Sequence, residues 1–164
     1  MFATWPHNNG QMPQLAFAPT LERKEEVFEM LGGKKHLGFA DNSQLKLMAI
    51  VRAGLPYQSV ESVGDKLELT DEAISTAIAI SRRTLIRRKT EGKLSSDESD
   101  RLLRLARVAS MAIETLGNAG KASHWLKQPN RALGNQTPLS MMDNDIGVRQ
   151  VESVLDHIEY GLPA

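Results

Sequence analysis

The chain has 164 residues, of which 41% are hydrophobic and 24% charged, and its formal net charge is zero. This length allows one ordinary domain or two small ones, and the composition excludes a chain that is disordered throughout. Cysteine is absent, which excludes disulfide bonds, thiolate metal sites and a cysteine nucleophile. No apolar run approaches the roughly 18 residues of a membrane span, and residues 1–20 lack the basic and apolar parts of a secretory signal. We therefore expect a cytoplasmic protein that does not bind a membrane.

Residues 1–42 are predicted to form an N-terminal arm with one short helix. Prolines and an Asn-Asn-Gly triplet interrupt residues 1–20, a composition typical of a flexible arm. The short helix is expected from Leu21 to Leu31, because two glycines follow and end it.

From residue 43 to residue 117 apolar residues recur at helical spacing, and polar residues mark the helix starts. Thr70 and Ser81 stand at the N-caps of two short helices, and Ser95 with Glu98 forms the capping box of a longer one. The residues that share an apolar face are Leu45, Met48 and Val51 in the first helix, Val60, Val63 and Leu67 in the second, and Leu102, Leu105, Ala106, Ala109, Ile113 and Leu116 in the long helix.

Three further helices are predicted in the C-terminal part. The first covers residues 119–127, and the second is a short helix from Pro138 to Met142 that Thr137 caps. The last carries an apolar stripe and ends at Gly161; the stripe consists of Val148, Val151, Leu155 and Ile158. No window alternates in the manner of a strand, so the predicted fold class is all-α.

The two short helices in the middle of the chain have helix-turn-helix spacing. They are predicted at Asp71–Ile78 and Arg82–Lys89, and only residues 79–81 separate them. Ala79 occupies the turn position that glycine usually takes, where a left-handed conformation costs an L-residue about 1 kcal/mol. A packed domain tolerates a cost of this size.

The second of these helices is strongly basic, because residues 81–94 contain six cationic side chains and one carboxylate. With Leu85 and Ile86 expected to face inward, most of the cationic side chains project outward. Recognition helices read base edges from their N-terminal residues while other cationic side chains neutralise phosphates. We therefore predict base contacts by Arg82, Arg83 and Thr84 and phosphate contacts by Arg87, Arg88 and Lys89. Ser81 is a further phosphate candidate, although helix capping alone explains it, and a basic helix that binds no DNA remains the alternative.

The C-terminal third carries a series of linked motifs. Ala122 precedes the pair Trp125-Leu126, and the turn Pro129-Asn130-Arg131-Ala132-Leu133-Gly134 follows. Next come Thr137-Pro138-Leu139 and a closing helix from Gly147 to Val151. In this order the motifs resemble the toxin-binding domain of Xre-type antitoxins of the RES–Xre and MbcA/ParS class. The resemblance extends over residues 70–164 and includes the long helix before the motifs.

This resemblance implies a two-part antitoxin with an arm and short helix at 1–42, an Xre-like helix-turn-helix DNA-binding domain at 43–108 and a toxin-binding domain at 109–164. Such a protein is no enzyme and binds no cofactor. It forms a homodimer within a larger toxin–antitoxin complex, binds operator DNA to repress its own operon, and masks a RES-domain toxin encoded in the same operon. Toxins of that class act on NAD or use it as an ADP-ribose donor. The residues implied to approach the toxin's active-site cleft are Glu159, Tyr160, Gly161, Leu162, Pro163 and Ala164.

Other functions remain open from the residues alone. The chain is alternatively a stand-alone transcriptional regulator whose C-terminal domain dimerises or binds a small effector, or a helical adaptor with a degenerate helix-turn-helix. The tail is alternatively a frayed terminus with nothing bound. The four histidines are scattered without metal-ligand spacing, and no phosphate-binding loop or catalytic motif is found, so we expect no metal site and no catalytic residue.

Overall fold

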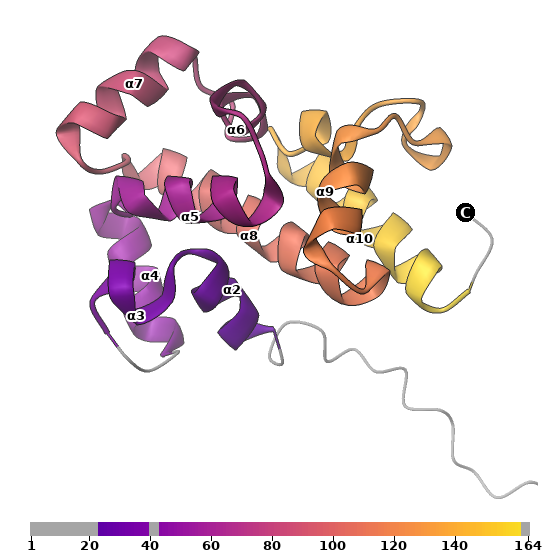
Figure 1. Ribbon diagram of the computed structural model, residues 1–164, viewed down its shortest axis with the longest axis horizontal. Helices are drawn as coiled ribbons and strands as arrows, with labels where there is room; N and C mark the ends of the chain where they lie inside the picture. Colours follow the sequence, from indigo (N-terminus) through magenta and orange to yellow (C-terminus); the bar gives the residue numbers. More distant parts are fainter. Residues whose placement is uncertain (1–22, 40–42, 162–164) are drawn as a thin grey trace, which may run out of the picture.

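The computed structural model describes residues 23–39 and 43–161, and these contain helices but no strand. Figure 1 shows the helices arranged around one long helix, α8, which confirms the predicted all-α fold. In chain order the elements are α2 (Lys24–Met30), α3 (Gly33–Leu37), α4 (Gln44–Ala53), α5 (Tyr57–Leu67), α6 (Asp71–Ala77), α7 (Arg82–Glu91), α8 (Ser96–Leu116), α9 (Ala119–Lys127), the 3-10 helices η1 (Arg131–Leu133) and η2 (Pro138–Met141), and α10 (Asp145–Glu159).

Helix α8 is the common packing partner of both halves of the chain. Its capping box forms as predicted, because the Glu98 N–H donates to Ser95 Oγ at 3.3 Å and the Ser95 N–H donates to the Glu98 carboxylate at 2.8 Å. Helices α2, α4, α5 and α6 pack against α8 together with α9 and α10. The hydrophobic residues of α8 that are fully buried are Leu102, Leu105, Ala106, Val108, Ala109 and Ala112.

The N-terminal helices belong to the body of the protein. Helix α2 is shorter than the predicted helix, and α3 was not predicted at all. Gly32 and Gly33 adopt positive φ values of 100° and 54°, so they turn the chain from α2 into α3 instead of ending the helical region. Phe28 and Leu31 lie in the core, and Arg23 forms an ion pair with Glu114 of α8 at 2.5 Å.

The predicted apolar face of α4 is only partly buried. Val51 is buried as expected, but Leu45 is 78% exposed and Met48 is 42% exposed. Helix α4 packs on α8 through a neighbouring face, on which Leu47 and Ile50 are partly buried against the core. The apolar spacing therefore identified the helix correctly and its orientation wrongly.

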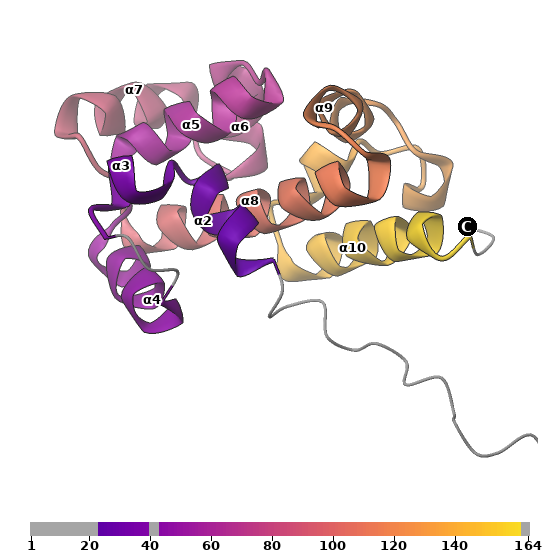
Figure 2. The same ribbon diagram turned by 60° about the horizontal axis from the view of Figure 1, so that its bottom comes forward.

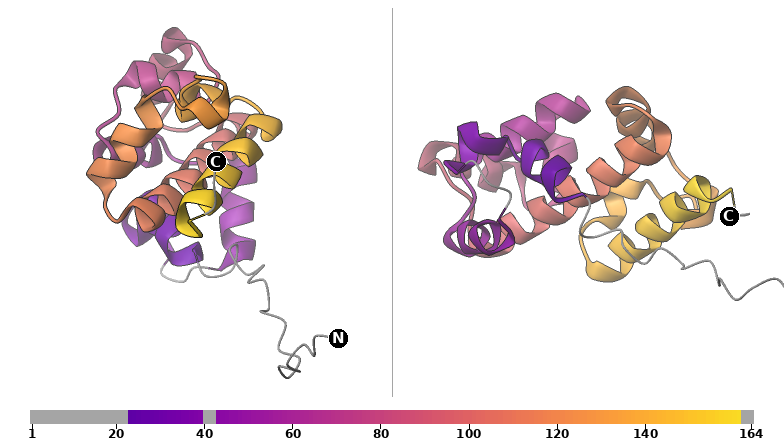
Figure 3. Two further views of the ribbon diagram at one scale, coloured as in Figure 1. Left: turned by 90° about the vertical axis from the view of Figure 1, so that its right-hand side faces the viewer. Right: turned by 90° about the horizontal axis from the view of Figure 1, so that it is seen from below.

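The C-terminal helices lie together at one end of the molecule (Figure 3). The predicted stripe of α10 is buried at Val148, Val151 and Leu155, whereas Ile158 is 40% exposed because it lies in the last turn. Thr137 caps η2 as expected, although this segment forms a 3-10 helix. Within the described ranges, no helix combines the length and the apolar character needed to cross a bilayer.

Candidate nucleic-acid interface and C-terminal tail

Helices α6 and α7 form the predicted helix-turn-helix on one side of α8, as Figure 2 shows. Both N-caps are in place, since the Ala73 N–H donates to Thr70 Oγ1 at 3.2 Å and the Thr84 N–H donates to Ser81 Oγ at 3.1 Å. Ala79 has φ +52°, which confirms that this alanine adopts the left-handed turn conformation.

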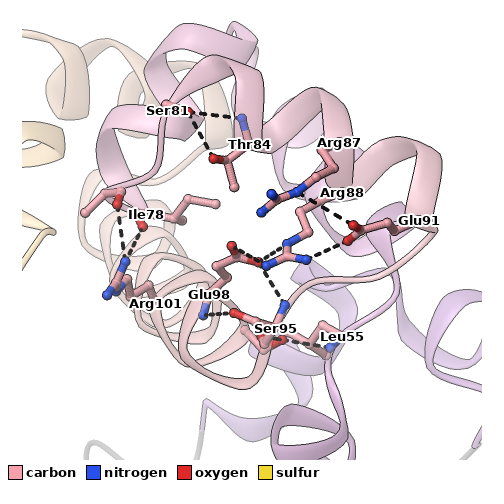
Figure 4. Close-up of polar contacts among 12 residues, drawn as sticks. Leu55, Ile78, Ser81, Thr84, Arg87, Arg88, Glu91, Ser95, Glu98 and Arg101 are labelled. Atoms are coloured by element: carbon pink, nitrogen blue, oxygen red, sulfur yellow. Dashed lines mark hydrogen bonds and ion pairs between the residues drawn. The ribbon is translucent and has the colours of Figure 1, made fainter.

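The turn between the two helices is held by a side chain that the sequence analysis did not identify. Nη1 of Arg101, on α8, donates hydrogen bonds to the carbonyl oxygens of Ile78 and Ala79, each at 3.2 Å (Figure 4). Carbonyl groups at the end of a helix lack partners within the helix, so this guanidinium satisfies them at the point where the chain reverses. Because the contact joins residues more than twenty positions apart, no local pattern predicts it.

The outward face of α7 is cationic. Arg82, Arg83 and Arg87 are exposed, and Lys89 also reaches solvent, with 63% of its side chain exposed. Lys89 Nζ lies 3.2 Å from a carboxylate oxygen of Glu61, and Arg87 Nε lies 3.6 Å from one of Glu91. Exposed pairs of this kind are weak, so both cations remain able to exchange a carboxylate for a phosphate.

One of the two predicted anchors of α7 differs from its predicted position. Ile86, expected to face inward, is 56% exposed, whereas Leu85 is buried. Consecutive residues of a helix point about 100° apart, so the single contact face of α7 accepts Leu85 and turns Ile86 outward. The prediction that both residues anchor the helix was wrong for Ile86.

Arg88, predicted as a phosphate contact, points toward α8 instead. Its Nε and Nη2 donate to the two carboxylate oxygens of Glu98 at 2.7 and 3.1 Å, and its Nη1 lies 2.5 Å from Glu91 (Figure 4). The side chain of Glu98 is only 8% exposed and that of Arg88 only 20%. Arg88 therefore joins α7 to the start of α8 and does not share the outward surface of Arg83 and Arg87.

The same carboxylate has a perturbed pKa. Burial opposes ionisation of Glu98 and raises its pKa, but hydrogen bonds from Arg88 and from the Ser95 N–H outweigh burial and hold the pKa below its ordinary value of 4.5. Hydrogen bonds to Glu98 and Glu91 raise the pKa of Arg88 above the ordinary range. The pair is therefore ionised at neutral pH. Sequence reasoning identified Glu98 as a helix cap but not as the partner of Arg88.

The tail, residues 159–164, begins at the end of α10. The Glu159 carboxylate lies 3.7 Å from Nη2 of Arg23 and accepts a hydrogen bond from Thr115 Oγ1 at 3.4 Å. Tyr160 is 61% exposed, and Gly161 is exposed with φ +63°. The other predicted toxin contacts, Leu162, Pro163 and Ala164, lie outside the described residues.

Comparison with known proteins matches both halves of the chain to one group. Residues 46–107 match the antitoxin Xre-like helix-turn-helix domain, and residues 111–161 match the antitoxin Xre/MbcA/ParS C-terminal toxin-binding domain. The first match contains α6 and α7, and the second contains α9 and α10.

Three curated relatives carry the name Antitoxin Xre. One from Photorhabdus laumondii is 34% identical over 128 residues, which cover 77% of this chain and 86% of the relative. One from Yersinia enterocolitica is 26% identical over 78% of this chain and 88% of the relative, and one from Pseudomonas putida is 37% identical over 58% and 63%. These relatives are antitoxins, a family without enzymatic activity. With its helix-turn-helix followed by a toxin-binding domain, the chain belongs to the Xre antitoxin family.

Proposed function

We propose that this antitoxin neutralises a RES-domain toxin encoded in the same operon and represses that operon by binding operator DNA as a cytoplasmic homodimer. The observation that carries the proposal is the pairing of an exposed cationic helix in a helix-turn-helix with a toxin-binding domain on the same chain. The first surface suits a polyanionic duplex, and the second suits a protein partner.

The DNA contacts are proposed from the exposed cations of α7 and from the half-buried Thr84. Arg82, Arg83 and Thr84 occupy its first turn, from which recognition helices reach base edges. Arg87 and Lys89 lie further along the exposed surface and are proposed to contact phosphates. Ser81 Oγ already accepts the Thr84 N–H, so its proposed phosphate contact is secondary to capping.

A salt titration tests this assignment. Binding of the full chain to a duplex from its own upstream region is measured by fluorescence anisotropy at several salt concentrations. Each phosphate contact contributes about −0.9 to the slope of log K against log salt, so Arg87→Ala is expected to flatten the slope by about one. Arg149→Ala removes another exposed cation, which lies on α10 and is 80% exposed against 59% for Arg87, and it serves as the control. An unchanged slope for Arg87→Ala would show that Arg87 does not contact a phosphate.

The toxin contacts are proposed at the tail. Tyr160 is a large exposed aromatic side chain, and aromatic residues are frequent anchors of protein interfaces. Net negative charge also accumulates from residue 143 to residue 164, with five carboxylates and one arginine. We propose that residues 159–164 enter the toxin cleft, where an aromatic ring and carboxylates take the place of a dinucleotide.

A truncation after Glu159 separates this role from folding. It keeps the contacts of Glu159 with Arg23 and Thr115, so the shortened chain is expected to fold and to bind upstream DNA as the full chain does. In cells that co-express the neighbouring toxin, it is expected to lose growth rescue. Ile146→Ala alters an exposed hydrophobic residue of α10, outside the tail, and is expected to rescue fully. Rescue by the truncated chain would show that the tail is not the inhibitory element.

Homodimerisation is tested on the isolated antitoxin. Helix-turn-helix proteins commonly bind two half-sites as symmetric dimers. Sedimentation equilibrium is expected to give about twice the chain mass of 18.1 kDa. A single-chain mass at micromolar concentration would contradict the proposed dimer.

A further inference from the structure

An isoleucine stands on the cationic surface of α7. Six large hydrophobic side chains are exposed among the described residues, and Ile86 is the one that belongs to the helix-turn-helix pair α6 and α7. Arg83 lies three residues before it and Thr90 four residues after it, positions that adjoin Ile86 on a helix surface. Ile86 is therefore an exposed apolar side chain on a helix surface whose other side chains suit polar or anionic partners.

The stability of the fold does not explain this residue. Leu85 supplies the buried anchor of α7, and an exposed β-branched side chain has a lower helix propensity than arginine, lysine or alanine. An isoleucine at this position is shielded from water only when a partner covers α7. The neighbouring arginines identify that partner as a polyanion.

The major groove of DNA offers one apolar group on its floor, the C5 methyl of thymine. A recognition helix in the groove brings its first two turns close to the base edges, and Ile86 lies at the start of the second turn, beside Arg83. In this placement an apolar side chain suits a methyl group, and the neighbouring guanidinium suits polar base atoms or phosphate.

We propose that Ile86 reads a thymine methyl in the operator and so contributes sequence specificity to an otherwise cationic helix. This inference rests on the proposed binding of operator DNA. It adds a chemical requirement, which is that the operator carries thymine at the position facing Ile86.

The test removes apolar groups from each side of the interaction, the methyl from thymine and carbon atoms from the side chain of Ile86. Two duplexes of the upstream region are prepared, one with thymine and one with uracil throughout, and the affinities of wild type, Ile86→Ala and Ile86→Val are measured. The wild type is expected to bind the uracil duplex about fourfold more weakly for each thymine methyl that Ile86 covers. Ile86→Ala is expected to bind the thymine duplex more weakly by a similar factor and to lose little more on uracil DNA. Ile86→Val keeps a branched apolar surface and is expected to retain most of the discrimination.

Controls distinguish this interaction from general effects of uracil on the duplex. Ile146→Ala, at an isoleucine that is 73% exposed on α10, is expected to discriminate between the duplexes as the wild type does. Equal discrimination by Ile86→Ala and wild type would overturn the inference while leaving DNA binding intact. Absence of salt-sensitive binding to either duplex would instead overturn the proposed DNA-binding function, and the inference with it.

Discussion

Replacing Glu98 with glutamine tests whether its ion pair with Arg88 holds the recognition helix to α8. The change keeps the shape of the side chain and one carbonyl oxygen, but it removes the charge and one of the two acceptors that Arg88 uses at 2.7 and 3.1 Å. Hydrogen bonds to charged groups contribute about 1.5–3 kcal/mol, and breaking a buried pair costs about 3–5 kcal/mol. Arg88 is 20% exposed and keeps Glu91 as a partner, so we expect a loss of about 2 kcal/mol in the free energy of unfolding.

The pH dependence of this loss has a definite sign. Because the folded-state pKa of Glu98 lies below its ordinary value of 4.5, ionised Glu98 stabilises the fold above pH 4.5, and this contribution disappears as the pH falls through the folded-state pKa. Glu98→Gln has no such titration. The difference in stability between wild type and variant is therefore expected to be constant near pH 7 and to shrink below pH 4.5.

The assay is urea unfolding followed by far-ultraviolet circular dichroism at neutral and acidic pH. At neutral pH the expected loss corresponds to a Tm lowered by roughly 4–8 °C for a chain of this size. Asp97→Asn is the control, because Asp97 is an exposed carboxylate in the same first turn of α8, and it is expected to cost less than about 1 kcal/mol. A Glu98→Gln chain as stable as the Asp97 variant, or a deficit that persists unchanged in acid, would refute the reasoning.

Three further predictions concern the turn of the helix-turn-helix, the glycine beside η2 and the two arginines in the middle of α7. Ala79→Gly removes a side chain at φ +52° and is expected to raise the free energy of unfolding by about 0.5–1 kcal/mol, measured by urea unfolding. Gly147→Ala places a Cβ against a backbone carbonyl of η2 and is expected to cost about 2 kcal/mol or more in the same assay, whereas Gly120→Ala, at an exposed position of α9, is expected to be neutral or stabilising. Arg88→Ala is expected to lower Tm, whereas Arg87→Ala is expected to leave Tm unchanged and weaken DNA binding alone, which unfolding and anisotropy measurements distinguish.

The helix starts were predictable because capping is local. A hydroxyl at the N-cap and the amide it accepts lie three residues apart, so Thr70, Ser81 and Ser95 carry their information in a short stretch of sequence. The same holds for the left-handed turn at Ala79, where the spacing of the two helices requires a tight reversal. Local geometry therefore identified the helix-turn-helix.

The orientation of side chains was less predictable, because it depends on which neighbour packs where. Apolar spacing alone does not distinguish the face of α4 that contacts α8 from the adjacent face that carries Leu45. In the same way, nothing within α7 shows that Arg88 meets a buried carboxylate ten residues later while Ile86 turns to solvent. These positions follow from tertiary contacts, and they change the proposed interface by removing one cation and adding one apolar group.

Charged residues along α8 contact both α7, the proposed DNA-binding helix, and α10, which leads into the proposed toxin-binding tail. Glu98 and Arg101 hold α7 and the turn that precedes it, while Arg104 and Arg107 form ion pairs with α10 at 3.4 and 3.1 Å. These four residues follow one another at intervals of three along α8. Because a step of three residues displaces a side chain by about 60° around the helix axis, the four together cover roughly half of the circumference of α8. The recognition helix and α10 consequently lie on opposite sides of α8, as Figure 2 shows. The predicted domain boundary at residues 108 and 109 falls within this unbroken helix. The proposed DNA-binding helix and the helix that leads into the proposed toxin-binding tail therefore pack on different sides of one continuous helix.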